Sequence, residues 1–351
     1  MSPPQEHLRA GRDLSEVVEE LELVVRAAER IRLDHYLQSS LGWKSRTKVQ
    51  RLITMGRVEV EGRPGKPAMK VGRGDRITIR LVLENAEREE HPPLAPPLWE
   101  DPYLLAIAKP PRRLVHPTGR TIGGTVIDEV HRRFAPLNAR GGRAVVPRLC
   151  HRLDRDTSGL LLVAKTAAIR RAVQVAFEAN EVRKGYLAVV EGEPAADRFE
   201  VDAAISDAID RSRAHSNRLS RIDEEEGRAS LTRFRVLGRG PGHAVIHCLP
   251  VTGRQNQIRV HLASVGHPIL GDTGYGSSPE GAALPEGLSF PDRALLHSLQ
   301  LRFRHPVWGT ERELRATVDR DLRPFLRALA IDEARIAPTP GLPRSPAVRA
   351  T

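Results

Sequence analysis

The sequence predicts an α+β protein, in which a small module of two helices and a short sheet precedes a larger domain. The larger domain is expected to have a mixed, mostly antiparallel sheet flanked by helices and loops. Three observations predict this class. Helical and strand periodicities alternate within residues 31–83, a proline-rich stretch follows, and residues beyond 98 contain many strand-like runs with few helical patterns between them.

The composition is that of a globular cytoplasmic protein. The chain has 351 residues, of which 40% are hydrophobic and 28% are charged. We find neither a signal-peptide pattern nor an apolar run near the ~20 residues that a membrane helix needs. Cys150 and Cys248 are the only cysteines, and His243 and His247 fall within a strand-like run. We therefore expect no disulfide framework and no bound metal.

Composition shifts divide the chain into five parts. Residues 1–30 form an N-terminal extension that we expect to be partly disordered, and residues 31–83 form the small module. Residues 84–97 are charged and then proline-rich, which indicates a linker. Residues 98–328 form the larger domain. Residues 329–351 are expected to be a largely disordered tail.

The net charge of +11 is concentrated in the small module. Residues 31–81 contain 12 basic and 4 acidic side chains, which is +8 of the total. A genome rich in G and C accounts for much of the arginine content, but the excess charge in one block indicates a polyanionic partner. Nucleic acid and an acidic membrane surface are both such partners.

The module's elements follow from its periodicity. "RLDHYLQSSL" and "SRTKVQRLITM" have apolar residues at helical spacing, and Gly56 is placed to end the second helix. "RVEVEG" and "DRITIRL" alternate as strands do. The second helix presents a basic face, formed by Arg46, Lys48, Arg51 and Arg57.

The larger domain repeats strand-like runs. They are "YLLAIAK", "LLLVAK", "GYLAVVEG", "ASLTRFRVLG", "HAVIHCLPV" and "LLHSLQLRF". Between the second and third, "TAAIRRAVQVAFEAN" has an apolar stripe at helical spacing with Thr166 as its N-cap. "QNQIRVHLASVG" is a second expected helix, and it would place Asn256 and Arg259 on one face.

A charged loop, "CHRLDRDTSG", precedes the strand "LLLVAK". Asp154 in this loop lies at the edge of a buried strand and needs a partner charge. A paired carboxylate in a cleft can act as a nucleophile or base, and a structural salt bridge is the alternative. The tripeptide Arg-Leu-Asp also occurs earlier, at Arg32-Leu33-Asp34.

The small module resembles the S4 RNA-binding domain. The resemblance rests on Arg32-Leu33-Asp34, Ser45-Arg46, "LITMGRVEVEG" and Gly74-Asp75. It implies that the polyanionic partner of this basic module is RNA rather than a membrane. In this setting we expect Asp34 to be structural, so the first Arg-Leu-Asp is not a reactive site.

The larger domain resembles the RluA-type pseudouridine synthase family. The matching motifs occur in the family's order over about residues 100–325: "IAKPPRRLVHP", "HRLDRDTSGLLLVAKT", "KGYLAVVEG", "PVTGRQNQIRVHLASVGHPILGD" and "LLHSLQLRFRHP". Two departures are visible. The usual Gly after Lys-Pro is missing, and Gln255-Asn256 stand where the family has Thr-His.

The resemblance implies an RNA uridine isomerase and assigns its catalytic residues. Asp154 is the nucleophile, which attacks C1′, adds to C6 or removes a sugar proton. Tyr186 is the aromatic wall of the uracil pocket and a candidate for deprotonating C5. Arg259 is the ion-pair partner of Asp154. Without the resemblance, Tyr186 would be interpreted as a core aromatic. The isomerisation oxidises nothing and transfers no external group, so the resemblance implies that no cofactor is needed.

Reaching the target uridine requires base flipping. Arg152 is the candidate for entering the vacated space, with a structural salt bridge as the alternative. Arg254, Asn256 and His261 are candidate RNA contacts, and surface solvation is the alternative for Arg254 and His261. We expect a monomer acting on large-subunit ribosomal RNA. Transfer RNA, a non-catalytic RNA-binding or assembly role, and RNA N-glycosidase activity are the competing hypotheses.

Overall fold

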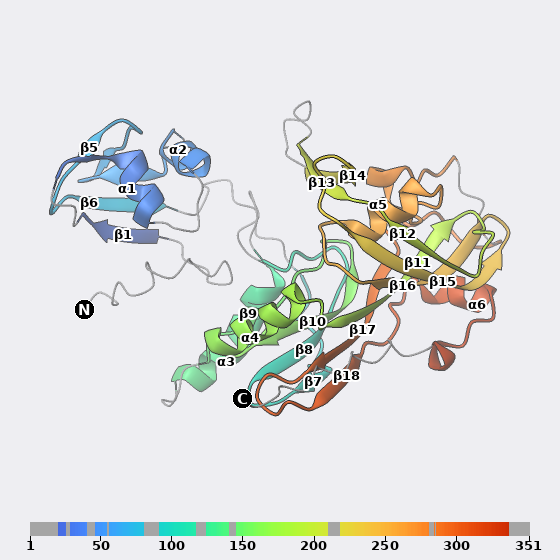
Figure 1. Cartoon of the computed structure of the whole chain (residues 1–351). Coiled ribbons are helices and arrows are strands. Elements are labelled where there is room, and N and C mark those ends of the chain that lie inside the picture. Colours follow the sequence, from blue (N-terminus) through green and yellow to red (C-terminus); the bar gives the residue numbers. More distant parts are fainter. Residues whose placement is uncertain are drawn as a thin grey trace, which may run out of the picture. The chain divides into compact units, whose positions relative to one another are not determined.

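The computed structural model describes residues 20–25, 29–40, 46–54, 56–80, 91–116, 124–139, 145–209, 218–280, 284 and 286–336. They form two compact units (Figure 1). The first consists of residues up to His91 together with His116–Asp128, and the second of Pro92–Val115 and residues from Glu129 onward. No helix in these ranges is long and apolar enough to cross a membrane.

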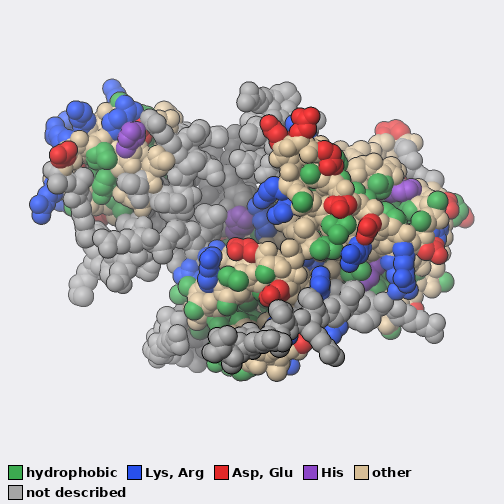
Figure 2. Space-filling view, viewed as in Figure 1, with side chains coloured by type: hydrophobic (Ala, Val, Ile, Leu, Met, Phe, Trp, Pro, Cys, Tyr) green, Lys and Arg blue, Asp and Glu red, His purple; other side chains and the backbone are tan. Residues whose placement is uncertain are grey.

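The first unit is the basic module. Helices α1 (Leu33–Ser40) and α2 (Arg46–Thr54) accompany a sheet in the order β1-β6-β3-β4, from β1 (Glu20–Val24), β6 (Arg76–Arg80), β3 (Val58–Val60) and β4 (Arg63–Pro64). A separate pair joins β2 (Ile31–Arg32) to β5 (Lys70–Val71). The expected apolar positions form one core, in which Leu33, Leu37, Val49 and Ile53 are buried. On the face of this unit that Figure 2 shows, Lys and Arg side chains gather and fewer carboxylates are visible.

The module begins earlier than the sequence pattern suggested. Strand β1 lies within the residues assigned to the N-terminal extension, and it pairs with β6 in antiparallel register. Leu23 and Val25 are buried in the module's core. The short run "ELELV", in which Glu22 is exposed and Leu23 is buried, is a strand that completes the sheet.

Two features of the module are explained by local geometry. Gly56 has a φ of 68° directly after α2, and the amides of Gly56 and Arg57 bond to Ile53 and Leu52, as expected at a helix C-terminus. The carboxylate of Asp34 is fully buried. It accepts bonds from Arg32 Nε and Nη2, from Gln50 Nε2 and from the amide of His35. The first Arg-Leu-Asp therefore joins the two helices and is structural, as expected.

The second unit is built on a ten-stranded sheet. Its main path is β12-β15-β16-β11-β17-β10-β8-β7, and β18 and β9 attach to β17 and β10. The strands are β7 (Trp99–Glu100), β8 (Leu104–Lys109), β9 (Arg148–Leu149), β10 (Ser158–Ala164), β11 (Arg183–Glu191), β12 (Arg198–Asp202), β15 (Leu231–Gly240), β16 (His243–Pro250), β17 (Leu296–Arg304) and β18 (Glu311–Arg315). Only the β10–β17 pair is parallel among the described strands, so the mixed, mostly antiparallel sheet is confirmed.

The continuous apolar sequence of β10 results from burial on both faces. Every residue of Ser158–Ala164 is buried. Leu160 and Leu162 belong to a core that also contains Val173 of α4 (Ala167–Glu178), while Leu161 and Val163 on the opposite face are also inaccessible. A strand covered on both sides shows no polar alternation. Thr166 Oγ1 accepts the amide of Ile169, which confirms the predicted cap of α4.

Gly159 permits the parallel pairing that leads into the site. It has a φ of 106° and lies opposite Ser298 of β17. A Cβ at this position would lie 2.1 Å from the carbonyl oxygen of Ser298. Only glycine allows the two strands to approach so closely, which explains the Thr-Ser-Gly sequence after the charged loop.

Several elements had no clear sequence signal. They are α3 (Val126–Ala139), the hairpin of β13 (Ile205–Ile209) and β14 (Arg218–Ile222), and the short strands β7, β9, β12 and β18. The expected helix at 255–266 is α5 (Gln257–Ser264). Beyond residue 328, where a tail was expected, the chain continues past α6 (Arg323–Ala328) to Ile336. Ile336 is buried, and its carbonyl accepts a bond from Arg315.

Replacing Asp34 with Asn should destabilise the basic module by about 1–3 kcal/mol, because a buried charged acceptor of several bonds is lost. The Arg32 hydrogen bond chiefly holds the pKa of Asp34 well below its usual range, so this stabilisation is present above about pH 4 and is lost as the pH falls. Amide exchange of peptides from residues 31–80 measures the effect. Asp154→Asn, the same change in the second Arg-Leu-Asp, is the control, and equal exchange in both variants would contradict the structural role.

Candidate active site

The charged loop before β10 carries Asp154 to the edge of the sheet. The amide of Thr157 donates to the carbonyl of Asp154, which closes a tight turn at the start of the strand. The Asp154 side chain is 28% exposed. Leu153 beside it is buried, so it anchors the loop while Asp154 stays accessible. The backbone thus presents one carboxylate at the surface of a hydrophobic layer.

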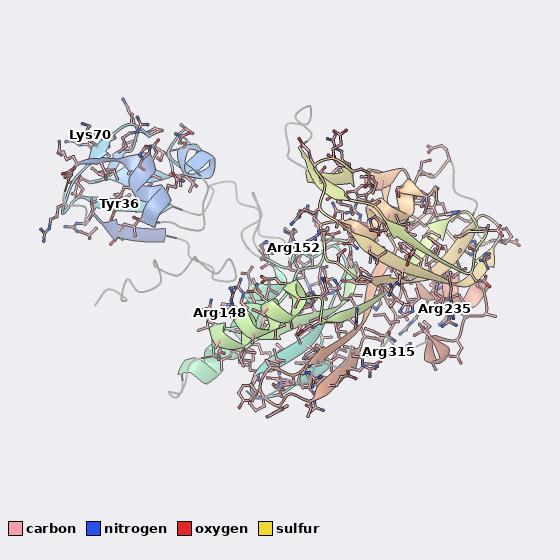
Figure 3. The ribbon with its side chains drawn as sticks, in the orientation of Figure 1. Tyr36, Lys70, Arg148, Arg152, Arg235 and Arg315 are labelled. Carbon is pink, nitrogen blue, oxygen red and sulfur yellow. The ribbon has the colours of Figure 1, made fainter. Side chains whose placement is uncertain are left out.

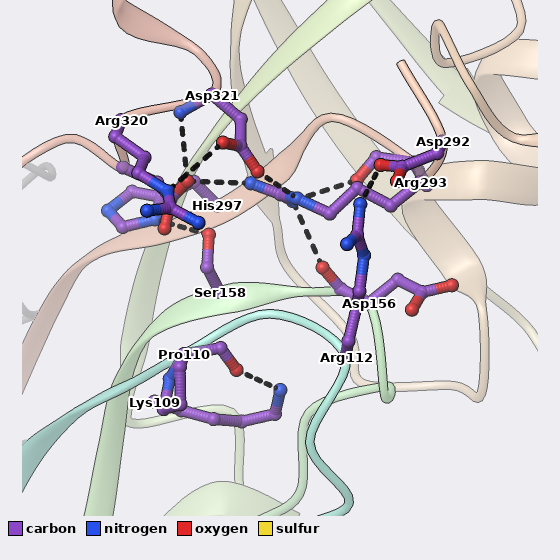
Figure 4. A network of polar contacts seen from close by, with 12 residues as sticks. Lys109, Pro110, Arg112, Asp156, Ser158, Asp292, Arg293, His297, Arg320 and Asp321 are labelled. Carbon is purple, nitrogen blue, oxygen red and sulfur yellow. Dashed lines mark hydrogen bonds and ion pairs between the residues drawn. The ribbon is translucent and has the colours of Figure 1, made fainter. Parts of the chain in front are cut away.

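Two buried cations hold the backbone that follows Asp154. Lys109 Nζ donates to the carbonyls of Arg155, at 2.8 Å, and Pro110, at 2.7 Å. Arg293 Nη1 donates to the carbonyl of Asp156 at 3.0 Å, and its other nitrogens bind Asp319 and Asp321 (Figure 4). Burial chiefly lowers the pKa of Lys109 to about 7. The lysine of the Lys-Pro motif therefore holds the backbone of the Asp154 loop in place.

Arg259, from α5, is held mainly by Asp272. Its Nε and Nη2 make two short bonds to Asp272, at 2.6 and 2.8 Å. The remaining Nη1 lies 3.4 Å from Asp154 and 3.0 Å from the Asn256 side-chain oxygen. Burial alone would lower the pKa of Arg259, but the bonds and charge of Asp272 outweigh it and raise the pKa. The bidentate contact therefore aims the guanidinium, and the contact with Asp154 is the longer one.

Tyr275 supports Arg259 from a second direction. The guanidinium carbon lies 4.8 Å from the centre of the Tyr275 ring, a cation–π arrangement. The Tyr275 hydroxyl donates to the carbonyl of Ser220, at 3.1 Å, and accepts its amide, at 3.0 Å. Ser220 lies on β14, so the β13–β14 hairpin is joined to the residues that hold Arg259.

Asp154, Asn256 and Arg259 line a cleft of about 450 Å³. Its lining comes from the Asp154 loop, from the C-terminal half of α4, from β11 and from the segment leading into α5. His151 packs against Phe177 of α4 with ring centres 5.0 Å apart, and its Nε2 accepts the amide of Leu162. Burial lowers the pKa of His151 to about 4, so this ring is neutral at pH 7.

Tyr186 lies in the wall of this cleft, on β11. Its side chain is 9% exposed. Burial is the main cause that raises its pKa to about 12, and the negative charge of Asp154 adds to the shift. The phenol therefore carries its proton at neutral pH. The structure brings Asp154, Tyr186 and Arg259 together around one cavity, although they are far apart in the sequence.

Three of the expected RNA contacts line the same cleft. Arg152 is exposed and is labelled in Figure 3. Arg32 forms an ion pair with the aspartate two residues later, but Arg152 does not. The two Arg-Leu-Asp copies therefore have different roles. Arg254 is partly buried and donates to the carbonyl of Ala229. Asn256 reaches Arg259 as expected, but from a left-handed position that precedes α5.

The expected phosphate contact of His261 is wrong. His261 is fully buried, its Nδ1 lies 3.0 Å from Thr232 Oγ1, and its Nε2 lies 3.2 Å from the carbonyl of Ala203. Burial also lowers its pKa, which disfavours a positive charge. Both ring nitrogens are occupied within the protein interior, so a phosphate cannot reach them.

The basic face of the first unit is only partly described. The second predicted helix is α2, but the side chains of Arg46, Lys48 and Arg51 lie outside the described part of the structure. Arg57 is partly buried just beyond the end of α2. Within the described ranges, no group of three or more His, Cys, Asp or Glu is arranged to hold a metal ion.

Asp272 is the functional residue that sequence reasoning missed. It is 3% exposed and carries the main contact to Arg259, from the turn before η2 (Thr273–Tyr275). A signal was present in "PILGDTGYG", where an acidic residue follows a buried apolar run and must find a cation. The identity of that cation, thirteen residues earlier on a helix, required the fold.

Comparisons with known proteins agree with this geometry. Residues 103–264 match the RNA pseudouridylate synthase family, and residues 31–77 match the S4 domain. The chain is 31% identical to ribosomal large subunit pseudouridine synthase D of Zymomonas mobilis, over 86% of this chain and 94% of that protein. It is 34% identical to ribosomal large subunit pseudouridine synthase C of Escherichia coli, over 85% and 92% of the two chains.

A solved structure shares the fold. Human RNA pseudouridylate synthase domain containing 4 has 26% sequence identity and a TM-score of 0.53, and the match covers 67% of this chain and 93% of that one. The chain belongs to the RNA pseudouridylate synthase family and carries an S4 domain in front of its catalytic unit.

Proposed function

We propose that this protein isomerises specific uridines of large-subunit ribosomal RNA to pseudouridine. The observation that carries the proposal is the ion pair of Asp154 with Arg259 beside Tyr186, in a cleft large enough for a flipped base. The names of the relatives favour ribosomal RNA over transfer RNA. We further propose that the protein acts as a monomer in the cytoplasm.

Asp154 is the group that acts on the target nucleoside. It is ion-paired yet 28% exposed, so it is oriented without being enclosed. Because Arg259 gives its two short bonds to Asp272, the carboxylate of Asp154 keeps lone pairs for the substrate. As nucleophile or base, Asp154 opens the path to breaking the bond between C1′ and N1.

Tyr186 forms the aromatic wall and, as phenolate, accepts the C5 proton late in the reaction. The negative charge of Asp154 is one cause of its raised pKa. When Asp154 forms a covalent bond or gains a proton, that charge disappears and the pKa of the phenol falls. The phenol then loses its own proton to solvent more readily, so the phenolate that accepts the C5 proton forms after Asp154 has acted.

Arg152 enters the stack that the flipped uridine leaves. It is exposed at the rim of the cleft, two residues before Asp154, and its charge is not neutralised by a described carboxylate. Arg254 and Asn256 contact the RNA from the segment before α5. Arg46, Lys48, Arg51 and Arg57 of the S4 domain bind phosphates elsewhere on the same RNA.

Mapping pseudouridines in total RNA tests the function. Deleting the gene should remove one or more pseudouridines from 23S ribosomal RNA, the wild-type gene should restore them, and Asp154→Ala should not. RNA binding by Asp154→Ala should be largely retained, because phosphate contacts supply most of the affinity. Loss of sites from transfer RNA alone would favour the runner-up. An abasic product, recognised by loss of the uracil mass, would indicate a glycosidase.

Asp272→Asn should lower kcat by about 100-fold with little change in RNA affinity, because Arg259 loses the bidentate contact that orients it toward Asp154. Single-turnover rates and filter binding on the same ribosomal RNA transcript separate the two effects. Asp197→Asn, which removes a carboxylate that is paired with Arg239 and is 84% exposed, is the matched control. A normal rate for Asp272→Asn would contradict the positioning of Arg259.

Replacing Arg46, Lys48 and Arg51 together with Ala should weaken RNA binding and flatten its salt dependence. The slope of log K against log salt should fall by roughly 0.9 for each lost duplex phosphate contact, or about 0.7 in single strands. Titrations from 50 to 300 mM salt measure this slope. If the slope stays at the wild-type value while the module remains folded, the positive charge faces something other than RNA.

A further inference from the structure

The catalytic cleft contains positive charge that the protein does not neutralise. Arg259 is paired with two carboxylates, but Lys184 and Arg254 donate only to backbone carbonyls among the described residues. Lys184 Nζ lies 2.7 Å from the carbonyl of Thr252. A lysine ammonium has three donors, so this single bond leaves capacity for a further acceptor.

The surroundings of Lys184 favour an anion. It is partly buried in the wall of the cleft, and removing an unpaired cation from water is unfavourable. The nearby segment is Thr252-Gly253-Arg254, and a Cβ on Gly253 would lie 3.3 Å from Nζ. The missing side chain leaves space beside the ammonium, and Arg254 of the same segment also lines the cleft.

The position of Lys184 relates it to the reacting base. Lys184 and Tyr186 are two residues apart on β11, and alternate residues of a strand lie on the same side, about 6.6 Å apart. This spacing is comparable to that between a base and its own phosphate in a nucleotide. A uracil against Tyr186 would therefore place a flanking phosphate near Lys184.

We propose that Lys184, with Arg254, forms a subsite that binds a phosphate next to the flipped uridine. This inference rests on the proposed function, because it takes the uracil to lie against Tyr186. Burial is the main cause that lowers the pKa of Lys184 to about 8, and Arg254 and Arg183 lower it further. A bound phosphate removes that repulsion, so the ammonium is stabilised when RNA is present.

Uridine and its monophosphates test the subsite without knowledge of the RNA target. Binding of uridine, uridine 5′-monophosphate and uridine 3′-monophosphate to the full chain is measured by calorimetry or ligand-observed NMR. At pH 7, one of the monophosphates should bind about tenfold tighter than uridine, as expected for a charge-assisted hydrogen bond. Which monophosphate is preferred identifies the phosphate as 5′ or 3′ to the base.

Three variants test whether Lys184 causes the preference for a monophosphate. Lys184→Gln should remove it, Lys184→Arg should retain it, and Arg233→Gln should leave it unchanged, because Arg233 is exposed on β15 and does not line the cleft. Above pH 8 the preference should decline in the wild type but not in Lys184→Arg. Arg183 and Arg254 act on the charge of Lys184, and Lys184 acts on His151. The other ionisable groups that line the cleft are Cys150, Arg152, Asp154, Glu178, Tyr186 and Arg259.

The subsite is wrong if the wild type shows no preference for a monophosphate, whether it binds all three probes equally or none. It is also wrong if Lys184→Gln keeps the full preference. Pseudouridine mapping remains an independent readout. If the wild-type protein shows no preference for a monophosphate while deletion of its gene removes pseudouridines from ribosomal RNA, the subsite alone is refuted. If the wild-type protein shows the preference but deletion of its gene removes no pseudouridine, the proposed function is refuted.

Discussion

The arrangement of the site depends on how one guanidinium is shared between two carboxylates. Arg259 has a fork of donors, and Asp272 occupies the bidentate side of it at 2.6 and 2.8 Å. Asp154 receives what remains, a single contact of 3.4 Å. If Asp154 held the bidentate side, its oxygens would be committed to the protein. The buried partner therefore keeps the exposed one available for a substrate, and the fold must bring α5, the turn at Asp272 and the loop at Asp154 to one place.

The need to keep Asp154 in position also explains why Lys109 and Arg293 are buried against the loop that carries it. A reactive carboxylate at the edge of a sheet requires a backbone that does not yield when charge changes during a reaction. Lys109 and Arg293 bind the carbonyls of Arg155 and Asp156, so the loop is held through main-chain oxygens rather than through the Asp154 side chain. Arg293 is in turn compensated by Asp319 and Asp321 from the segment after β18. Asp319 and Asp321, in the last part of the larger domain predicted over residues 98–328, are thus part of the support of the active site.

The sequence predicted the elements that follow from hydrophobic periodicity or from local interactions. The helices of the basic module, the strands on both sides of the charged loop and the cap at Thr166 follow from periodicity and capping chemistry. Asp154, Tyr186 and Arg259 were predicted because the motifs resembled a known family, not because spacing alone required a site. The β13–β14 hairpin and α3 were missed, since their apolar residues are interrupted by charges and their stability comes from tertiary packing.

The errors at single residues have one common cause, which is that a side chain's partner is set by the fold. His261 follows Arg259 by two positions, and it was expected to contact a phosphate or to be exposed at the surface. On a helix, however, a step of two residues turns to a different face, and here that face lies against Thr232 of β15.

Asp272 shows the converse. Its carboxylate is 3% exposed, and burial there requires a cation, which Arg259 of α5 supplies. The two Arg-Leu-Asp tripeptides make the same point within one chain. In the first, arginine and aspartate bind each other and a neighbouring helix, whereas in the second they separate, and the aspartate takes its partner from 105 residues away.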